Sequence, residues 1–342
     1  MKTLNVLVTG AGGPLGQSIM KAIRQANLSC RLVATDRHPL SVGFQWSERH
    51  YLLPSAAEAE YLPRLRAICQ AEKVDAILIG SEGEMHVLAE NREAFEGDTG
   101  TKIIVSPQEV LEISADKWKT VNFLASNELA YPHSAIPEQA EQLEQLLSDH
   151  AFPLIVKPRR GSGSKGMFKV HNRRELNGAL LLVNQPIVQE YLEPDEEEYT
   201  IAVFMGREGR AQGAIVMWRE LAAGLTYRAR VVENGLVADA AAAVANALGP
   251  LGPCNVQLRL TERGPVTFEI NARFSSTTSM RAYFGYNEVE MALRCYVLGE
   301  NITPPKPRSG IALRFWEESY LPDPEAVGTI PRDMVTEPDY RR

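Results

Sequence analysis

The sequence predicts an α/β protein in which a domain built on a parallel sheet is followed by an α+β domain. The first hundred residues alternate short apolar runs with amphipathic stretches, which is typical of β-α-β units. From residue 153 onward, strands of the antiparallel type are separated by turns rich in Gly, Asn and Glu. A chain of 342 residues is also long enough for two or three domains.

The expected parallel strands are the apolar runs of the first hundred residues. They cover residues 4–9, 31–35, 75–79 and 102–105. Two helical stretches follow, at 107–113 and 115–126, and Ser114 stands where an N-cap of the second is expected. This helix pair is interpreted as the connection between the domains.

The expected strands of the second part are short and separated by turns. They cover residues 153–158, 166–171, 186–192, 199–204, 212–217, 254–260 and 265–270. The last two flank a turn over residues 261–264 that ends in Gly264, and they predict a β-hairpin. After Gly299 a proline-rich run and a charged end give no structural prediction.

Composition excludes several classes of function. A formal net charge of -7 argues against a phosphate backbone or an anionic membrane as the main partner, so neither nucleic acid nor membrane is expected. Cys30, Cys69, Cys254 and Cys295 form no C-x-x-C pair, which favours neither a zinc cluster nor a disulfide framework. No signal-type segment and no run of membrane-spanning length is present, so a cytoplasmic location is expected.

A glycine-rich turn, from Gly10 to Gly16, follows the first strand and opens a helix. Such a turn exposes backbone N–H groups to an anion, and Asp36 after the second strand stands where a ribose-binding acid stands in dinucleotide folds. The alternative interpretation, equally supported, is that the turn serves close packing and that Asp36 caps a loop. No Tyr-x-x-x-Lys pair is present, so the proton-transfer pair that a sugar-nucleotide epimerase needs is missing. Glu82 and Glu84, after the third strand, are candidates for substrate contact or for a helix start.

The strongest local signal lies at residues 153–167. An apolar strand ends in Lys157 and is followed by a loop in which Gly161, Gly163 and Gly166 let the main chain approach phosphate groups closely. Ser162 and Ser164 add hydroxyl donors. Because the lysine precedes the glycines and no helix follows, this is not a Walker A loop.

The later strands supply the remaining parts of a nucleotide site. Residues 189–192 (Gln189, Glu190, Tyr191 and Leu192) form a strand whose backbone is suited to reading an adenine, and Glu198 is the candidate ribose ligand. Glu269 and Asn271 are two residues apart on one strand, so their side chains share a face, and Gln257 on the paired strand lies opposite. Three oxygen ligands of this kind suit Mg²⁺ completed by phosphate oxygens and water. Arg273 follows on the same face and would reach a transferred phosphoryl group.

Taken in this order, these residues resemble the ATP-grasp superfamily. The residues 255–257 and 268–273 look most like the synthetase units of the carbamoyl phosphate synthetase large subunit, in which a Gln supplies one metal ligand. The resemblance implies a Rossmann-like pre-ATP-grasp domain at 1–113, an ATP-grasp domain at 114–300 with its lid at about 120–190, and a C-terminal extension at 301–342. It also implies that Lys117 is a second phosphate ligand, that the glycine loop covers ATP, and that Glu269 bridges two magnesium ions.

The expected activity is that of an ATP-grasp ligase that forms carbon–nitrogen bonds. It would phosphorylate a carboxylate, pass the acyl group to an amine or thiol and release ADP and phosphate. ATP and Mg²⁺, or Mn²⁺ in its place, are the expected cofactors, and small carboxylates and amines are the expected partners. A homodimer is left open. The alternatives are a carbamoyl-phosphate-synthetase-like phosphorylating enzyme, a non-catalytic nucleotide-binding regulator, and an NAD-dependent sugar-nucleotide enzyme. Arg219 and Arg228 are either contacts of an anionic substrate or surface residues.

Overall fold

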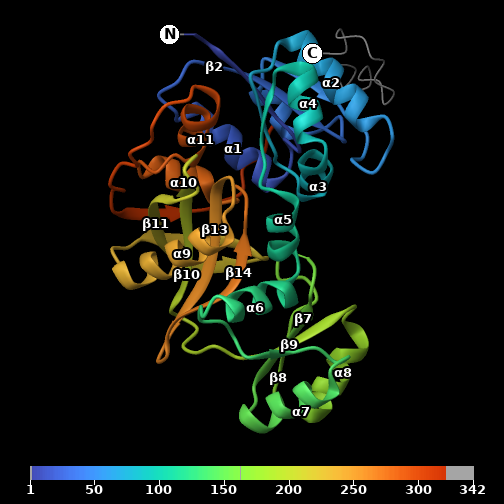
Figure 1. Ribbon diagram of the computed structural model, residues 1–342, viewed down its shortest axis with the longest axis vertical. Helices are drawn as coiled ribbons and strands as arrows, with labels where there is room; N and C mark the ends of the chain where they lie inside the picture. The colour runs from blue at the N-terminus through green and yellow to red at the C-terminus, as the bar shows by residue number, and fades with distance from the viewer. Residues whose placement is uncertain (1, 162, 321–342) are drawn as a thin grey trace.

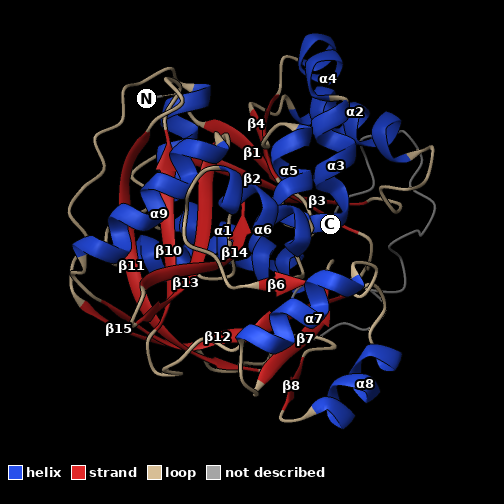
Figure 2. Cartoon of the chain, turned by 60° about the horizontal axis from the view of Figure 1, so that its bottom comes forward, coloured by secondary structure: helices blue, strands red, loops and turns tan. Residues whose placement is uncertain are grey.

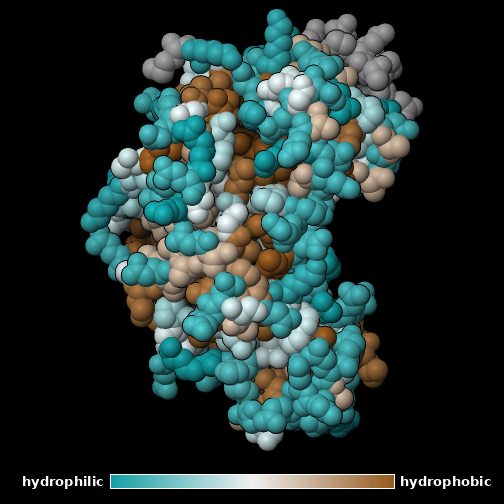
Figure 3. All heavy atoms as spheres, in the orientation of Figure 1, coloured by the Kyte–Doolittle hydropathy of each residue, from teal (hydrophilic) through white to brown (hydrophobic). Residues whose placement is uncertain are grey.

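The chain folds around three β-sheets, and the computed structural model describes residues 2–161 and 163–320. Figure 1 shows the N-terminal residues in blue at the top, the largest sheet beside and below them, and a small sheet at the bottom. Over the lower part of the molecule the surface is mostly hydrophilic (Figure 3). No described helix combines the length and the apolar character needed to cross a membrane.

The N-terminal sheet is parallel throughout, as the alternating pattern predicts. Its strand order is β3-β2-β1-β4-β5, and β3 was not among the expected strands. Its strands are β1 (Leu4–Val8), β2 (Cys30–Asp36), β3 (Arg49–Leu52), β4 (Ala76–Leu78) and β5 (Lys102–Ile104). Its helices are α1 (Pro14–Arg24), α2 (Tyr61–Glu72), α3 (Glu82–Glu90) and α4 (Arg92–Thr99), with a 3₁₀ turn at Val42–Trp46. The parallel strands direct their carboxyl ends to one edge.

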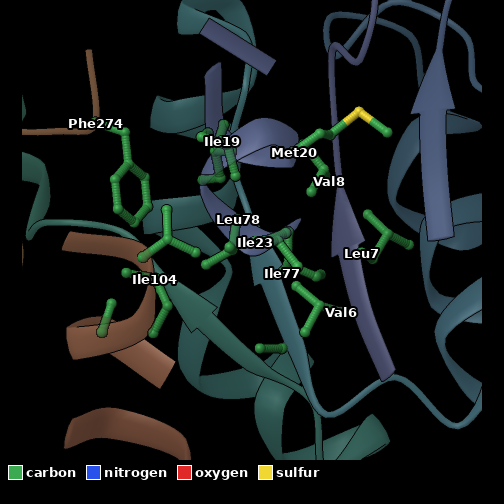
Figure 4. Close-up of a cluster of buried hydrophobic side chains, with 14 of the residues drawn as sticks. Val6, Leu7, Val8, Ile19, Met20, Ile23, Ile77, Leu78, Ile104 and Phe274 are labelled. Carbon is green, nitrogen blue, oxygen red and sulfur yellow. The ribbon is translucent and has the colours of Figure 1, made fainter. Parts of the chain in front are cut away.

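The core of this sheet reaches into the C-terminal half of the chain. Figure 4 shows Phe274 close to Ile104, beside buried side chains of β1, α1 and β4. Both belong to one hydrophobic cluster, and Phe274 is only 2% exposed. Because Phe274 directly follows Arg273, this packing fixes the end of β14 against the N-terminal sheet.

Two helices, α5 (Gln108–Ala115) and α6 (Lys117–Ser126), connect the first sheet to the small sheet, as Figure 1 shows. The prediction that Ser114 caps the second helix is wrong. Ser114 lies inside α5, where its hydroxyl donates to the carbonyl groups of Val110 and Leu111. The N-cap is Asp116, whose carboxylate accepts from the backbone N–H groups of Trp118 and Lys119. Asp116 has an extended backbone conformation, and this residue separates α5 from α6.

The small sheet is four-stranded and antiparallel, with order β6-β9-β7-β8. Its strands are β6 (Ser134–Ala135), β7 (Leu154–Pro158), β8 (Phe168–Val170) and β9 (Pro186–Glu190). Helices α7 (Ala140–Asp149) and α8 (Arg173–Leu182) pack on it and close a separate hydrophobic cluster.

The largest sheet has six antiparallel strands in the order β14-β13-β10-β11-β12-β15. The strands are β10 (Glu198–Met205), β11 (Ala211–Ala222), β12 (Leu225–Val231), β13 (Gly252–Thr261), β14 (Gly264–Asn271) and β15 (Gly310–Leu313). Helix α9 (Gly235–Leu248) covers one face (Figure 2). On the other face, α10 (Thr278–Tyr283), α11 (Glu288–Ala292) and a π-helical turn at Leu293–Val297 join this sheet to α1. The predicted hairpin is confirmed as β13–β14, and part of the C-terminal extension forms the edge strand β15.

Candidate functional site

A cavity of about 360 Å³ lies between the small sheet and the face of the six-stranded sheet opposite α9. Its walls come from β7 and the loop after it, from the segment after β9, and from β10, β11, β13 and β14. Cations outnumber carboxylates along these walls, which favours an anionic ligand. The charged lining residues are Lys117, Lys157, Arg160, Lys165, Lys169, Glu190, Glu198, Arg219, Arg259 and Glu269.

Two lysines face each other at the end of β7. Burial, together with repulsion from Lys117, lowers the pKa of Lys157 to about 8. Burial also lowers the pKa of Lys117, although the carboxylate of Glu269 opposes this. The Nζ atom of Lys117 donates to the carbonyl oxygen of Gly161 at 2.8 Å, which brings the loop to the lysines. A polyanion bound here would relieve the repulsion between the two cations.

The loop after β7 contributes main-chain groups to the same cavity. Gly161, Gly163 and Gly166 have φ values of 125°, 70° and 69°, in a region of backbone conformation that glycine adopts without steric cost. Gly161, Gly163 and Ser164 line the cavity, whereas Ser162 lies outside the described residues.

The predicted adenine residues lie on and just after β9, which pairs with β7, and the predicted ribose residue lies on β10 of the six-stranded sheet. Residues 189–192 line the cavity, but the amide of Gln189 donates to Ser134 on β6 at 2.8 Å, so this side chain serves the small sheet. Glu198 lies on the six-stranded sheet with both carboxylate oxygens in ion pairs. Oε1 accepts from Arg219 at 2.8 Å and Oε2 from Arg259 at 2.6 Å. The carboxylate is therefore held rigidly at the cavity wall.

The three predicted oxygen ligands do share one region of the sheet. Gln257 pairs directly with Glu269 across the β13–β14 ladder, and the amide nitrogen of Asn271 donates to Oε1 of Glu269 at 2.8 Å. Gln257 and Glu269 line the cavity described above, whereas Asn271 and Glu269 line a second cavity next to it.

The second cavity, of about 160 Å³, lies between α3 of the N-terminal sheet and β14. It shares Lys117, Arg160, Gly161 and Glu269 with the first cavity. Arg273 lines it, with its guanidinium donating to Oδ1 of Asn271 at 2.8 Å and to the carboxylate of Glu82. Glu82 and Arg273 thus meet across 191 residues of sequence at one wall of a small polar chamber.

These donors fit a magnesium ion at one position. Glu269 offers a carboxylate, and Asn271 offers the amide oxygen that accepts from Arg273 at 2.8 Å, a set that Mg²⁺ uses together with phosphate oxygens and water. Oε1 of Gln257 already accepts from Nη2 of Arg219 at 2.7 Å. Among the described residues, no group of three or more His, Cys, Asp or Glu side chains is placed to hold a metal, so phosphate oxygens would have to complete the shell.

Comparison with protein families gives two matches, one for each part of the chain. Residues 6–104 match a PylC-like N-terminal domain, and residues 114–277 match an ATP-grasp domain. Residues 114–277 form a domain of the ATP-grasp family. The second match contains the glycine loop, both lysines, and the strands that carry Glu198, Gln257 and Glu269.

Similar sequences and similar solved structures are both found at low sequence identity to this chain. The carbamoyl phosphate synthase large chain of Pyrococcus furiosus is 22% identical over 286 residues, which are 78% of this chain and 26% of that protein. This chain therefore spans about a quarter of the length of that relative. N5-carboxyaminoimidazole synthetase from Staphylococcus aureus, solved with ADP, has a TM-score of 0.69 at 15% identity, covering 91% of this chain and 80% of that one. L-amino acid ligase from Bacillus licheniformis has a TM-score of 0.65 at 18% identity, covering 86% and 74%.

The sequence left the role of Arg219 open and did not point to Arg259. Arg219 is only 9% exposed and lines the first cavity, so its interpretation as a surface residue is wrong. Arg228, in contrast, is an exposed residue paired with Glu220 at 2.7 Å. Arg259 was not singled out at all. The signal that distinguishes them is register: Arg219 and Arg259 face Glu198 from the two strands that flank β10, whereas Arg228 lies on β12, next to the edge strand.

The glycine-rich turn of the N-terminal sheet is held by contacts with its own neighbours, beside a cavity of about 280 Å³. Oδ2 of Asp36 accepts from the backbone N–H of Gly12 at 2.7 Å and from the hydroxyl of Ser41 at 3.1 Å. A Cβ on Gly16 would come within 2.3 Å of the carbonyl oxygen of Gly10. These contacts favour the packing interpretation of the turn over dinucleotide binding.

Proposed function

We propose that this chain is an ATP-dependent ligase that joins a carboxylate to an amine or thiol through an acyl phosphate. The observation that carries the proposal is the pair of adjoining cavities. One is large and rich in cations, the other is small and polar, and they meet at Lys117, Arg160, Gly161 and Glu269. A nucleotide in the first would place its terminal phosphate at this junction, beside a carboxylate held in the second.

The nucleotide is bound between the small sheet and the six-stranded sheet. Lys117 and Lys157 bind its phosphates, and the main chain of Gly161, Gly163 and Ser164 covers them, so the small sheet acts as a lid. The backbone of residues 190–192 contacts the adenine, and Glu198 accepts hydrogen bonds from the ribose hydroxyls. The division into a pre-ATP-grasp domain, an ATP-grasp domain and a C-terminal extension is part of this proposal.

Magnesium is held by Glu269 and Asn271. When bound, it supplies positive charge to the phosphate oxygens and lowers the barrier to phosphoryl transfer. The protein's own contribution is positional. Asn271 orients Glu269 through its amide nitrogen, and Arg273 is fixed at the junction by Asn271 and by the carbonyl oxygen of Phe274.

The proposed reaction has two chemical steps, phosphoryl transfer and acyl transfer. An oxygen of the substrate carboxylate attacks the γ-phosphorus of ATP, the bond to the β-phosphate oxygen breaks, and ADP leaves with that electron pair. The nucleophile then attacks the acyl carbon, phosphate leaves, and the proton of the nucleophile passes to solvent. Lys117, Lys157 and Arg273 offset the charge that develops on the transferred group.

Hydroxylamine provides a direct test, because it replaces many amines as an acyl acceptor and yields a hydroxamate. The chain is incubated with ATP, Mg²⁺, hydroxylamine and a panel of small carboxylates that includes amino acids. We expect ADP, phosphate and hydroxamate in equal amounts with at least one carboxylate. Release of AMP and pyrophosphate would refute the acyl phosphate, and nucleotide binding without any turnover would support a regulator instead.

A further inference from the structure

A buried cation already occupies one side of the predicted metal site. Arg219 extends from β11 toward the first cavity and donates from Nε and Nη2 to Oε1 of Glu198, at 3.0 and 2.8 Å. The same Nη2 donates to Oε1 of Gln257 at 2.7 Å. Its side chain is 7% exposed, so three hydrogen bonds and two neighbouring strands fix the guanidinium.

Gln257 cannot easily hold a metal ion while this arrangement persists. A divalent ion on its amide oxygen would lie beside the guanidinium, which stays protonated at any working pH. The amide is neutral and adds no charge to offset the repulsion between the two cations. Moving Arg219 away would break its buried pair with Glu198 and leave that carboxylate partly unpaired, which is costly.

The guanidinium of Arg273, at the Asn271 side of the predicted metal site, is less buried than that of Arg219. Arg273 contacts Oδ1 of Asn271, but its acidic partner, Glu82, has a side chain that is 48% exposed. Glu82 belongs to α3, on a different sheet, and water can replace it as a partner. A magnesium ion at Glu269 and Asn271 has to displace Arg273, whose side chain is 17% exposed and whose acidic partner is half-exposed, whereas an ion at Gln257 has to displace Arg219 from a pair in which both side chains are more deeply buried.

We propose that this ATP-grasp site binds its nucleotide with a single divalent ion, held by Glu269 and Asn271, and that Arg219 supplies the positive charge on the Gln257 side. This rests on the proposed function, since it requires ATP with a divalent metal in the first cavity. It replaces the expectation that Glu269 bridges two ions. Arg219 is then a phosphate-facing residue, and Gln257 is the residue that positions it.

The number of bound ions is measured without turnover. The protein is saturated with a non-hydrolysable ATP analogue and titrated with Mn²⁺, and bound and free Mn²⁺ are distinguished by electron paramagnetic resonance. We expect one protein-dependent Mn²⁺ per bound analogue in the wild type, without the spin coupling between neighbouring ions that a bridged pair shows. Two coupled ions would overturn the inference and leave the proposed function intact. Failure of the analogue to bind would overturn both.

Three variants test the role of Arg219 itself. Arg219→Met frees the amide oxygen of Gln257, and we expect a second Mn²⁺ per analogue. Arg219→Lys keeps a cation and retains a single ion. Arg259→Met is the matched control, because Arg259 also pairs with Glu198, at 2.6 Å, but has no hydrogen bond to Gln257; it retains a single ion. A second ion in both methionine variants would assign the effect to Glu198 and contradict the inference.

Discussion

Lys157 combines a position at the cavity wall with a pKa that burial lowers to about 8. A lysine with this pKa loses its proton in mildly alkaline solution, whereas phosphate binding requires the charged form. Nucleotide binding therefore takes up a proton above this pKa.

We expect the affinity for ATP to fall as pH rises through 8. Relative to pH 7, binding at pH 9 should be about tenfold weaker, because the free protein must first be protonated at Lys157. Isothermal titration calorimetry in buffers of different ionisation enthalpy measures both the affinity and the proton uptake. Lys157→Arg is the control, since its guanidinium does not titrate and its profile should be flat between these values. A flat wild-type profile would contradict the assignment of Lys157 to the phosphates.

Removal of the charge of either Lys157 or Glu269 should abolish turnover. Lys157→Ala and Glu269→Ala each lose a group that stabilises the transferred phosphoryl, at a cost on the order of 3 kcal/mol or more, which is roughly a hundredfold in rate. Neither should unfold the protein, and thermal melting checks this. Glu262→Ala, at an exposed position in the turn of the same hairpin, is the control and should retain wild-type turnover. Wild-type turnover in both site variants at saturating ATP and Mg²⁺ would show that the site lies elsewhere.

At this scale the sequence predicted residues whose chemistry is local. Lys157, Glu269 and Asn271 are recognisable because a strand places alternate residues on one face; Lys157 lines the first cavity, Asn271 the second, and Glu269 both. The role of Arg219 was left open, because it depends on the register of β11 against β10, which sets Arg219 beside Glu198. Cross-strand register is a tertiary property that no single strand encodes.

At the scale of elements, Asp116 joins α6 to the small sheet. It caps α6 and receives Nε and Nη2 of Arg159 at 3.1 and 2.8 Å. The backbone N–H of Lys117 also donates to the carbonyl oxygen of Arg159 at 2.9 Å. Cap and ion pair together therefore fix the first residue of α6 beside the glycine loop.

Asp116→Ala should destabilise the protein by about 2–4 kcal/mol, because it removes a helix cap and leaves the Arg159 guanidinium without its buried partner. Asp116→Asn retains an oxygen for the cap and should recover about 1 kcal/mol of this loss. Urea denaturation measures both. Equal stability of the two variants would mean that the cap contributes nothing and that the charge alone acts.

Elements with a clear pattern were predicted, and elements defined by pairing partners were not. The runs of β1, β2, β4 and β5 have buried apolar centres, so hydrophobicity alone identifies them. Strand β15 follows a proline-rich run and exposes Ile311 and Leu313, so it exists only because β12 pairs with it. Ser114 and Asp116 are both good capping residues, and only the bend between α5 and α6 distinguishes them.

At the scale of the whole molecule, the backbone of the glycine loop after β7 lies against the backbone of the six-stranded sheet at Gly224. Gly224, in the turn between β11 and β12, lies so close to the glycine loop that a Cβ there would come within 2.1 Å of the carbonyl oxygen of Gly163. No rearrangement of a side chain can relieve this overlap, because both partners are backbone. The turn therefore sets how closely the loop approaches the phosphate-binding lysines.

Gly224→Ala should push the loop away from the cavity and weaken ATP binding by on the order of tenfold, the equivalent of about 1.4 kcal/mol. Alanine at this position also has to adopt a φ of 73°, which by itself destabilises the fold by about 1–2 kcal/mol. Gly209→Ala separates the two effects. Gly209 lies in the neighbouring hairpin turn with a φ of 69°, and a Cβ there meets no atom within 4 Å. Both variants should lose similar stability in urea denaturation, whereas only Gly224→Ala should lose affinity for ATP in titration calorimetry. Equal affinities in the two variants would show that the glycine loop does not need this approach to cover the nucleotide.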